Sequence, residues 1–293
     1  MKKYNVLSLF DGISCAKAAL ERADIPVDNY FASEIENHSI TIAQKNFPDI
    51  TQLGDICNIN ASELPHIDLI IGGSPCTNLS AAGDRTGLDG SESKLFYEFI
   101  RLLEEVKPTH FILENVASMT DRNKDLMSNI IGTEPIMIDA GRVSAQIRRR
   151  YFWCNFRVTQ PEYNYQVLSD VLVPRIEAED ITDRMMKKSP GTLAYVNAWK
   201  FVRYPNQKAR TLMAGGQGIS NTGATNIQVG DRYYKPSPVE CERLMGLPDD
   251  YTAGIPITAR YKSLGNAFSV DVVSHILCEM LKNEDKSEQM KLF

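Results

Sequence analysis

The chain of 293 residues contains few of the residues that build metal centres or disulfide frameworks. It has four histidines, and its six cysteines stand far apart with no C-x-x-C pair. Scattered thiols are typical of free cysteines in a reducing compartment. No signal-peptide segment precedes the first strand pattern, and no apolar run approaches the roughly 20 residues that span a membrane. We therefore expect no metal, no membrane partner and a cytoplasmic location.

The charges are unevenly distributed along the chain. The net charge is −5, which argues against a protein whose whole surface binds nucleic acid. Between positions 184 and 235, however, Asp231 is the only acid among nine basic residues. One basic face could therefore still meet a polyanion. The nine are Arg184, Lys187, Lys188, Lys200, Arg203, Lys208, Arg210, Arg232 and Lys235.

Short apolar runs alternate with helical patterns in the first half of the chain, which predicts a mostly parallel sheet covered by helices. After about residue 158 the pattern weakens, and glycines mixed with Asn and Thr near 215–223 predict exposed loops. The predicted strands are 5–10, 30–33, 69–72, 110–114, 135–139 and 151–156. The predicted helices are 16–23, 39–46, 94–106, 124–131 and 270–281.

The first strand runs into Phe10-Asp11-Gly12-Ile13-Ser14, a glycine turn before a helix. Ligands of open α/β sheets bind beyond the carboxyl ends of strands. There Glu34 would suit a ribose diol, and Asp55 an adenine amino group, since a carboxylate accepts several hydrogen bonds. A single glycine after a strand is usually only a tight turn. The fingerprint G-x-G-x-x-G is absent, which disfavours a nicotinamide dehydrogenase.

The most informative run is Gly72-Gly73-Ser74-Pro75-Cys76, which follows an apolar strand pattern. A thiolate at the carboxyl end of a strand is well placed to act as a nucleophile. A lone cysteine is more often a buried structural thiol, but the small, polar and glycine-containing residues 77–93 lack an apolar periodicity and favour a mobile lid.

Two polar groups occur at other strand ends. Glu114 ends a buried strand, where apolar surroundings favour its protonated form. Arg148, Arg149 and Arg150 precede another strand, and alternation sends the first and third to one side. Taken singly, Glu114 could be a helix cap and the arginines a solvated charge run.

Together these motifs resemble the DNA cytosine-C5 methyltransferase family. Gly-Ser-Pro-Cys at 73–76, Glu-Asn-Val at 114–116 and Gln-x-Arg-x-Arg at 146–150 stand in the family's order. Residues 10–12, 238–251 and 260–267 are similar to further family signatures, so that the resemblance extends from about residue 4 to residue 281. Phe-Asp-Gly-Ile at 10–13, Lys-Leu-Phe-Tyr-Glu-Phe at 94–99 and Arg-Tyr-Phe-Trp at 150–153 resemble most closely the compact de novo-type branch.

The resemblance implies an α/β fold, a Rossmann-like S-adenosylmethionine methyltransferase sheet with helices on both faces, plus a smaller target-recognition lobe. Residues 1–160, completed by 258–293, would form the catalytic and cofactor-binding domain. Residues 161–257 would form the recognition lobe, with a variable segment at about 206–235.

The implied reaction transfers a methyl group from S-adenosyl-L-methionine to C5 of a cytosine in a specific sequence of duplex DNA. Cys76 would attack C6 and make C5 enamine-like, and Glu114 would offset the charge that develops toward N3. Arg150 would hold the base at O2, and Arg148 would contact a phosphate. The base would be flipped out of the duplex, because the enzyme cannot reach the ring atoms of a base that is stacked and paired.

The resemblance also implies which residues contact the cofactor and the DNA. Many relatives have further glycines in the first loop, where this chain has Ser14 and Cys15. The cofactor set is Phe10, Asp11, Gly12, Ile13, Ser14, Glu34, Asp55, Ile56, Cys57, Pro75, Asn266, Ala267 and Phe268. The DNA set is Arg210, Gln217, Asn221, Asn226 and Arg232, each of which could equally be a solvated loop residue.

Three alternatives stand beside this interpretation. The runner-up is a tRNA cytosine-C5 methyltransferase; the others are a catalytically inactive regulatory homologue and a plain oxidoreductase. The sequence specifies neither the target site nor the role, which could be restriction–modification, viral self-protection or gene regulation. A bacterial or phage origin is our preferred hypothesis, with the protein near the nucleoid or in a host cytoplasm, and a monomer is the default oligomeric state.

Overall fold

The computed structural model describes residues 2–75, 93–174, 178–215 and 225–291. The chain forms two compact units, each built from segments that are separate in the sequence. The first unit consists of Met1–Ile138, Arg149–Gln160 and Val273–Phe293; the second consists of Asp139–Arg148 and Pro161–Val272. The second unit thus includes 139–148 and 258–272, which the sequence assigned to the catalytic domain.

The first unit is built on a seven-stranded sheet of order β3-β2-β1-β4-β5-β7-β6. The pairs from β3 to β5 are parallel, and β7 pairs with β5 in the antiparallel direction. Parallel neighbours require crossover connections, and helices supply most of them here. The strands are β1 (Tyr4–Leu9), β2 (Val27–Ser33), β3 (Thr51–Gln52), β4 (Leu69–Gly73), β5 (His110–Val116), β6 (Ile136–Asp139) and β7 (Arg149–Cys154).

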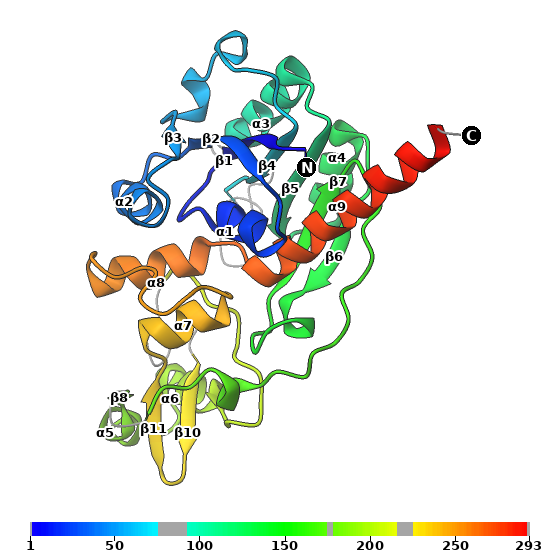
Figure 1. Cartoon of the computed structure of the whole chain (residues 1–293). Helices are drawn as coiled ribbons and strands as arrows, with labels where there is room; N and C mark the ends of the chain where they lie inside the picture. The colour runs from blue at the N-terminus through cyan, green and yellow to red at the C-terminus, as the bar shows by residue number, and fades with distance from the viewer. Residues whose placement is uncertain (1, 76–92, 175–177, 216–224, 292–293) are drawn as a thin grey trace. The chain divides into compact units, whose positions relative to one another are not determined.

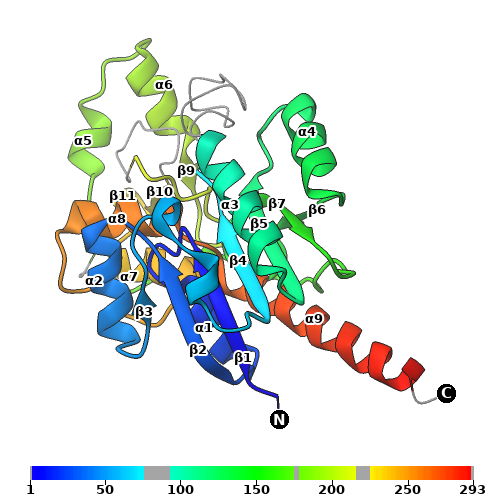
Figure 2. The ribbon, with the colours of Figure 1, turned by 90° about the horizontal axis from the view of Figure 1, so that it is seen from above.

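Helices cover both faces of this sheet, as the sequence predicts. In Figure 1, α1 (Cys15–Arg22) and α9 (Val270–Lys291) lie in front of the strands, and α3 (Ser93–Val106) and α4 (Asp121–Ile131) lie behind them. Figure 2 shows α3 alongside β4 and β5. On that face Phe96 and Phe99 of α3 pack with Leu9, Ile70 and Trp153 in one buried cluster. The apolar period near 3.6 in α3 thus becomes its buried stripe.

Every predicted strand and helix is present, although several ends differ. β2 begins at Val27 rather than at residue 30, α4 begins at Asp121, and α9 continues to Lys291 rather than ending at residue 281. Thr120 explains the earlier start of α4, because its side chain accepts a hydrogen bond from the Asn123 amide as an N-cap. The sequence did not predict β3, and α2 (Asn37–Asn46) begins two residues before the predicted helix 39–46.

The second unit contains a four-stranded sheet of order β8-β11-β10-β9, which the sequence did not predict. Its centre is the hairpin of β10 (Asn226–Val229) and β11 (Arg232–Lys235), which turns at Gly230 with a φ of 62°. Ile181, Met185, Ala198 and Tyr233 form its buried cluster. The other elements are β8 (Glu179–Asp180), β9 (Val202–Arg203), α5 (Thr182–Met186), α6 (Leu193–Lys200), α7 (Pro238–Leu244) and α8 (Ile257–Asn266).

One stretch is long enough, and on average apolar enough, to cross a membrane by length and composition alone. It is Ile257–Asp285, whose most apolar window has a mean hydropathy of 1.2, although charged residues such as Arg260 and Asp271 interrupt it. Within the most apolar part of this stretch, 67% is buried inside the protein. Val273, Ile276 and Leu277 are core residues there. Buried core helices of globular proteins have this composition too.

Candidate functional site

The carboxyl ends of β1 and β2 are tied together by the Glu34 side chain. One carboxylate oxygen of Glu34, Oε2, accepts a hydrogen bond from the Gly12 amide at 2.8 Å. The other, Oε1, accepts from the amides of Ile35 at 2.7 Å and Glu36 at 2.8 Å. A carboxylate has about four acceptor positions, so Glu34 keeps capacity for a further donor. Its position and orientation therefore fit the predicted contact with a ribose hydroxyl.

The loop that follows β1 is held from inside by Asp11. This carboxylate is 5% exposed and accepts hydrogen bonds from the hydroxyls of Ser8, Ser14 and Tyr30. Burial raises the pKa of Asp11, and the three hydroxyls oppose that rise. Asp11, Ser14 and Ile13 are buried, whereas Phe10 and Gly12 are half-buried. The loop therefore offers a ligand mainly its backbone.

Asp55 lies beyond β3 and caps a short 3₁₀ turn, η1 (Ile56–Asn58). Its Oδ1 accepts from the Cys57 amide at 3.0 Å, and the Ser33 hydroxyl donates to the preceding Gly54 carbonyl at 2.7 Å. The cap leaves the exposed Asp55 carboxylate with a second oxygen directed away from that amide. Ile56 is buried and Cys57 is exposed.

The segment that leads to Cys76 is anchored by β5. Gly73 of β4 stands opposite Glu114 of β5, and Asn115 Nδ2 donates to the Ser74 hydroxyl at 3.1 Å and to the Ser74 carbonyl at 3.3 Å. Asn115 and Ser74 are buried, and Pro75 is half-buried. Cys76 itself lies outside the described residues. Asn115 was not among the predicted site residues, although its place in Glu-Asn-Val was the available signal.

Gly72 shows why a glycine is needed just before this segment. A Cβ at Gly72 would come within 2.8 Å of the Leu9 carbonyl oxygen and 3.2 Å of a Phe99 ring carbon. Backbone and a packed ring cannot move aside cheaply. Glycine at this position therefore allows the close approach of the backbone to Leu9 and Phe99.

Glu114 and Arg150 form an ion pair at the end of the β5–β7 ladder. Arg150 Nε lies 2.7 Å from Glu114 Oε1, and the two side chains are 15% and 14% exposed. An opposite charge at this distance favours the ionised carboxylate, whereas the sequence suggested that apolar walls would favour the protonated form. The expectation for the unliganded carboxylate is therefore revised. Both groups retain hydrogen-bonding capacity in a partly exposed position.

Arg148 does not occupy the place that the sequence assigned to it. It is 3% exposed, and its guanidinium donates to the carbonyls of Leu212 at 3.0 Å, Gly265 at 3.0 Å and Ala267 at 2.8 Å. The predicted phosphate contact is thus wrong for this arrangement, because the side chain is enclosed in the second unit. Arg148 instead holds the backbone of the predicted C-terminal cofactor motif, in which Asn266 is exposed, Ala267 buried and Phe268 half-buried.

The predicted DNA-contact residues fall into different environments. Arg232 is exposed on β11 and pairs with Asp180 at 2.6 Å. Arg210 is half-buried with its guanidinium 4.4 Å from the centroid of the Phe201 ring. Asn226 is 2% exposed and donates to the Ala198 carbonyl at 2.8 Å, so the prediction that it reaches a base edge is wrong. Gln217 and Asn221 lie outside the described residues.

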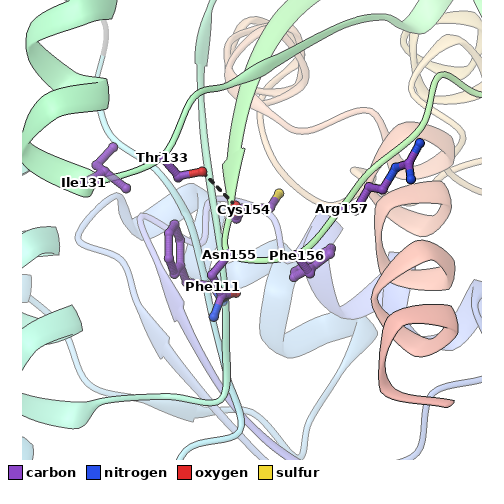
Figure 3. Close-up of a pocket in the computed structure, with 8 residues that line it drawn as sticks. Phe111, Ile131, Thr133, Cys154, Asn155, Phe156 and Arg157 are labelled. Carbon is purple, nitrogen blue, oxygen red and sulfur yellow. Dashed lines mark hydrogen bonds between the residues drawn. The ribbon is translucent and has the colours of Figure 1, made fainter. Parts of the chain in front are cut away.

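A shallow hollow of about 430 Å³ occurs at the opposite end of the central sheet. Phe111 at the start of β5, Cys154 at the end of β7 and Thr133 line it, together with Arg157 at its rim (Figure 3). The hollow is remote from the carboxyl ends of β1, β4 and β5, where the site residues gather. Within the described part of the chain, no group of His, Cys, Asp and Glu side chains is placed to hold a metal ion.

The chain has the α/β methyltransferase fold, which solved structures of that class share over nearly its whole length. The structure of the Entamoeba histolytica methyltransferase EhMeth matches with a TM-score of 0.77, at 16% identity, covering 96% of this chain and 99% of that one. A putative DNA modification methyltransferase encoded within an Escherichia coli prophage matches with a TM-score of 0.70, at 19% identity, covering 97% and 100%.

The sequence profile of the family named C-5 cytosine-specific DNA methylase matches residues 4–134 and 145–282. The chain therefore belongs to the C-5 cytosine-specific DNA methylases, which transfer a methyl group from S-adenosyl-L-methionine to C5 of cytosine in DNA. The type II methyltransferase M1.ScrFI of Lactococcus lactis subsp. cremoris is 25% identical over 98% of this chain and 80% of its own length. The type II methyltransferase M.NlaX of Neisseria lactamica is 25% identical over 94% and 96%.

Proposed function

We propose that the catalytic residues divide the reaction between Cys76 as nucleophile, Glu114 as the group facing N3 and Arg150 as the group facing O2. The observation that supports this most strongly is the ion pair of Glu114 and Arg150 beside the Ser74–Pro75 segment. The Cys76 sulfur forms a bond to C6, and the electron pair of the C5–C6 double bond makes C5 nucleophilic. After methyl transfer, the C5 proton leaves to a base and the thiolate is expelled.

Glu114 and Arg150 would act on the pyrimidine ring as the charge develops. A guanidinium can donate to the base O2 while it remains in contact with the carboxylate, because it presents five N–H donors. Glu114 takes up a proton as it engages N3, which offsets the negative charge on the ring. The ion pair before binding keeps both side chains in position, so little reorganisation is needed when the base enters.

We place the cofactor at the carboxyl ends of β1, β2 and β3. S-adenosyl-L-methionine, when bound, supplies the methyl group as an electrophilic sulfonium. Glu34 would accept from the ribose hydroxyls with the acceptor capacity that three backbone amides leave, and Asp55 would accept from the adenine amino group. The backbone of residues 10–14 and Pro75 would complete the part of the site that belongs to the first unit. The family resemblance also assigns residues 266–268 to the cofactor.

The second unit would carry target recognition. Of the predicted DNA residues that the structure describes, the exposed Arg232 and the half-buried Arg210 remain candidates for contacts to duplex DNA, and Gln217 and Asn221 stay predictions. The local acids Glu179 and Asp180 neutralise part of the basic cluster that the sequence suggested, since Arg184, Arg232 and Lys235 all pair with them. DNA contact would require Arg232 to exchange Asp180 for a phosphate or a base edge.

The finer biological assignments rest on similarity alone. The sequence details at 10–13, 94–99 and 150–153 support membership of the compact de novo-type branch. The type II names of the full-length relatives support a place in restriction–modification, in the bacterial cytoplasm or at the nucleoid. A monomer is the simplest state in which one chain supplies all the proposed site residues.

The proposed roles are tested by transfer of labelled methyl groups from S-adenosyl-L-methionine to mixed-sequence duplex DNA, with tRNA assayed in parallel. We expect label in DNA as C5-methylcytosine, its loss in Cys76→Ala, and its retention in Cys278→Ala, whose half-buried free thiol on α9 belongs to no proposed contact. Label in tRNA alone would favour the alternative function, a tRNA cytosine-C5 methyltransferase. Label retained in Cys76→Ala would show that Cys76 is not the nucleophile.

A further inference from the structure

The carboxylate of Asp11 lies at the centre of a buried hydroxyl cluster beneath the first loop. Oδ1 accepts from the Ser8 hydroxyl at 2.6 Å and from the Tyr30 hydroxyl at 2.7 Å. Oδ2 accepts from the Ser14 hydroxyl. Ser8 and Ser14 are 0% exposed and Tyr30 is 2% exposed, so all three donors are enclosed. Neither Ser8 nor Tyr30 belongs to the predicted cofactor set.

The backbone around Asp11 adopts an unusual conformation. Phe10, Gly12 and Ser14 have φ angles of 56°, 60° and 59°, all in the left-handed region. Glycine enters that region without strain, but a residue with a Cβ does so only when other contacts hold it. Ser14 is held twice by Asp11, through its hydroxyl and through its amide, which donates to the Asp11 carbonyl at 3.1 Å. Ser14 is also the N-cap of α1, and its carbonyl accepts from the Ala18 amide at 3.1 Å.

We propose that Asp11 is a positioning residue that holds Ser14 in the left-handed conformation, so that a serine can stand where the loop geometry favours glycine. The inference rests on the proposed cofactor site at this loop. Asp11 is enclosed and already accepts from three hydroxyls, so its side chain acts through the loop and not by touching the cofactor.

A connected set of bonds carries this effect to the predicted ribose contact. Asp11 fixes the turn, and the Asp11 amide donates to the Ser33 carbonyl at 3.0 Å, directly before Glu34. Gly12 follows Asp11 and donates its amide to Glu34 Oε2 at 2.8 Å. If the turn relaxes, Glu34 loses one of the three amides that orient it. Cofactor affinity therefore depends on Asp11, although the carboxylate is remote from solvent.

Two substitutions at Ser14 separate this role from a direct contact. Ser14→Gly removes the hydroxyl and also the strain, whereas Ser14→Ala removes the hydroxyl but keeps the Cβ. We expect S-adenosyl-L-methionine and S-adenosyl-L-homocysteine to bind Ser14→Ala roughly 3- to 10-fold more weakly than Ser14→Gly, because only the alanine keeps the strained Cβ. Calorimetric titration measures both. Equal losses for the two variants would show that the hydroxyl itself contacts the ligand and would overturn the proposal.

A double substitution tests the coupling to Asp11. Asp11→Ala is expected to weaken binding by roughly 10- to 100-fold, and Asp11→Ala/Ser14→Gly to recover at least about 5-fold of that loss. If the loss of affinity in the double variant equals the product of the losses in Asp11→Ala and Ser14→Gly, the positioning role of Asp11 is contradicted. Tyr30→Phe, which removes one donor and retains the ring, serves if Asp11→Ala does not fold; its loss must likewise shrink in the Ser14→Gly background. If the unmodified protein binds neither ligand, the proposed cofactor site is wrong. If it binds both ligands but the effects of Asp11 and Ser14 substitutions are independent, only the positioning role of Asp11 is wrong.

Discussion

Arg150 Nε lies 2.7 Å from Glu114 Oε1, across two strands that run in opposite directions. Arg150 stands opposite Val116 in the register, and Glu114 stands opposite Phe152, so the ion pair runs diagonally across the ladder. Neighbouring strands thus bring together a carboxylate and a guanidinium that are distant in the sequence. Because the pair is partly exposed, a ligand can reach both partners.

Replacing Arg150 by lysine tests the fork geometry of this pair. Lysine retains the charge but cannot contact the carboxylate and a base oxygen in one plane. We expect the rate of methyl transfer in a single turnover to fall about 10²- to 10³-fold, with cofactor affinity unchanged. Arg149→Lys is the matched control, because Arg149 is exposed on the same strand. An equal loss of cofactor affinity, or no loss of rate, would contradict the proposed role of Arg150.

Asn115 provides a second test, since it fastens the segment before Cys76. Asn115→Ala should misplace that segment and lower the single-turnover rate roughly 10- to 100-fold. The control is Asn155→Ala: Asn155 bonds to the Phe111 amide and the Thr109 carbonyl at the other end of the same strand. Asn155→Ala should lower stability without lowering the rate. A comparable rate loss in both variants would indicate general destabilisation instead.

Arg148 is predicted to stabilise the fold of the second unit and not to bind phosphate. Arg148→Met leaves three buried carbonyls without their charged donor, which should reduce the free energy of unfolding by about 3–5 kcal/mol. Urea unfolding measures that loss, and Arg149→Met should change it by less than about 0.5 kcal/mol. Normal stability combined with weaker, less salt-dependent DNA binding would restore the phosphate contact that the sequence suggested.

Glu279 should make stability depend on pH in the acid range. Burial alone raises the pKa of Glu279, but hydrogen bonds from Lys282 and Thr159 outweigh it and lower the pKa from 4.5 to about 2. A carboxyl with a lowered folded pKa stabilises above its unfolded pKa and loses that contribution as pH falls through the folded pKa. Because the Lys282 partner is exposed and solvent screens the pair, the contribution should be on the order of 1 kcal/mol near pH 7, and it should disappear between about pH 5 and 2. Unfolding curves of Glu279→Gln should accordingly converge with those of the unmodified protein at low pH, and parallel curves would contradict the assignment.

Much of the first unit follows from the sequence, because its strands are buried on both faces and read as continuous apolar runs. The strand ends then bring Glu34, Glu114 and the Gly72–Gly73 end of β4 to one edge, as the sequence predicts. The prediction for the Arg148 side chain was wrong for a local reason. β7 begins only at Arg149, and the Arg148 amide donates instead to the Asp139 carboxylate at 3.0 Å. Strand alternation therefore does not apply to Arg148.

The second unit was harder to predict, because its strands carry little periodic pattern. β8 and β9 have two residues each, too few for an alternation to be detected. Asn226 resembles a loop residue by type, yet it begins β10 and its side-chain amide is satisfied inside the unit. The hydroxyl cluster around Asp11 was also not predictable, since Ser8 and Tyr30 reach it from two strands whose relative register only the fold defines.

The most direct test of the account uses duplex DNA in which target cytosines carry fluorine at C5. The Cys76 sulfur can still add to C6 and C5 can still be methylated, but fluorine cannot leave as the proton does, so the protein remains bound to the base. We predict a covalent complex that needs S-adenosyl-L-methionine and that peptide mass spectrometry assigns to Cys76. An adduct at another cysteine such as the exposed Cys57, or methylation of ordinary DNA without any trapped complex, would contradict nucleophilic catalysis by Cys76.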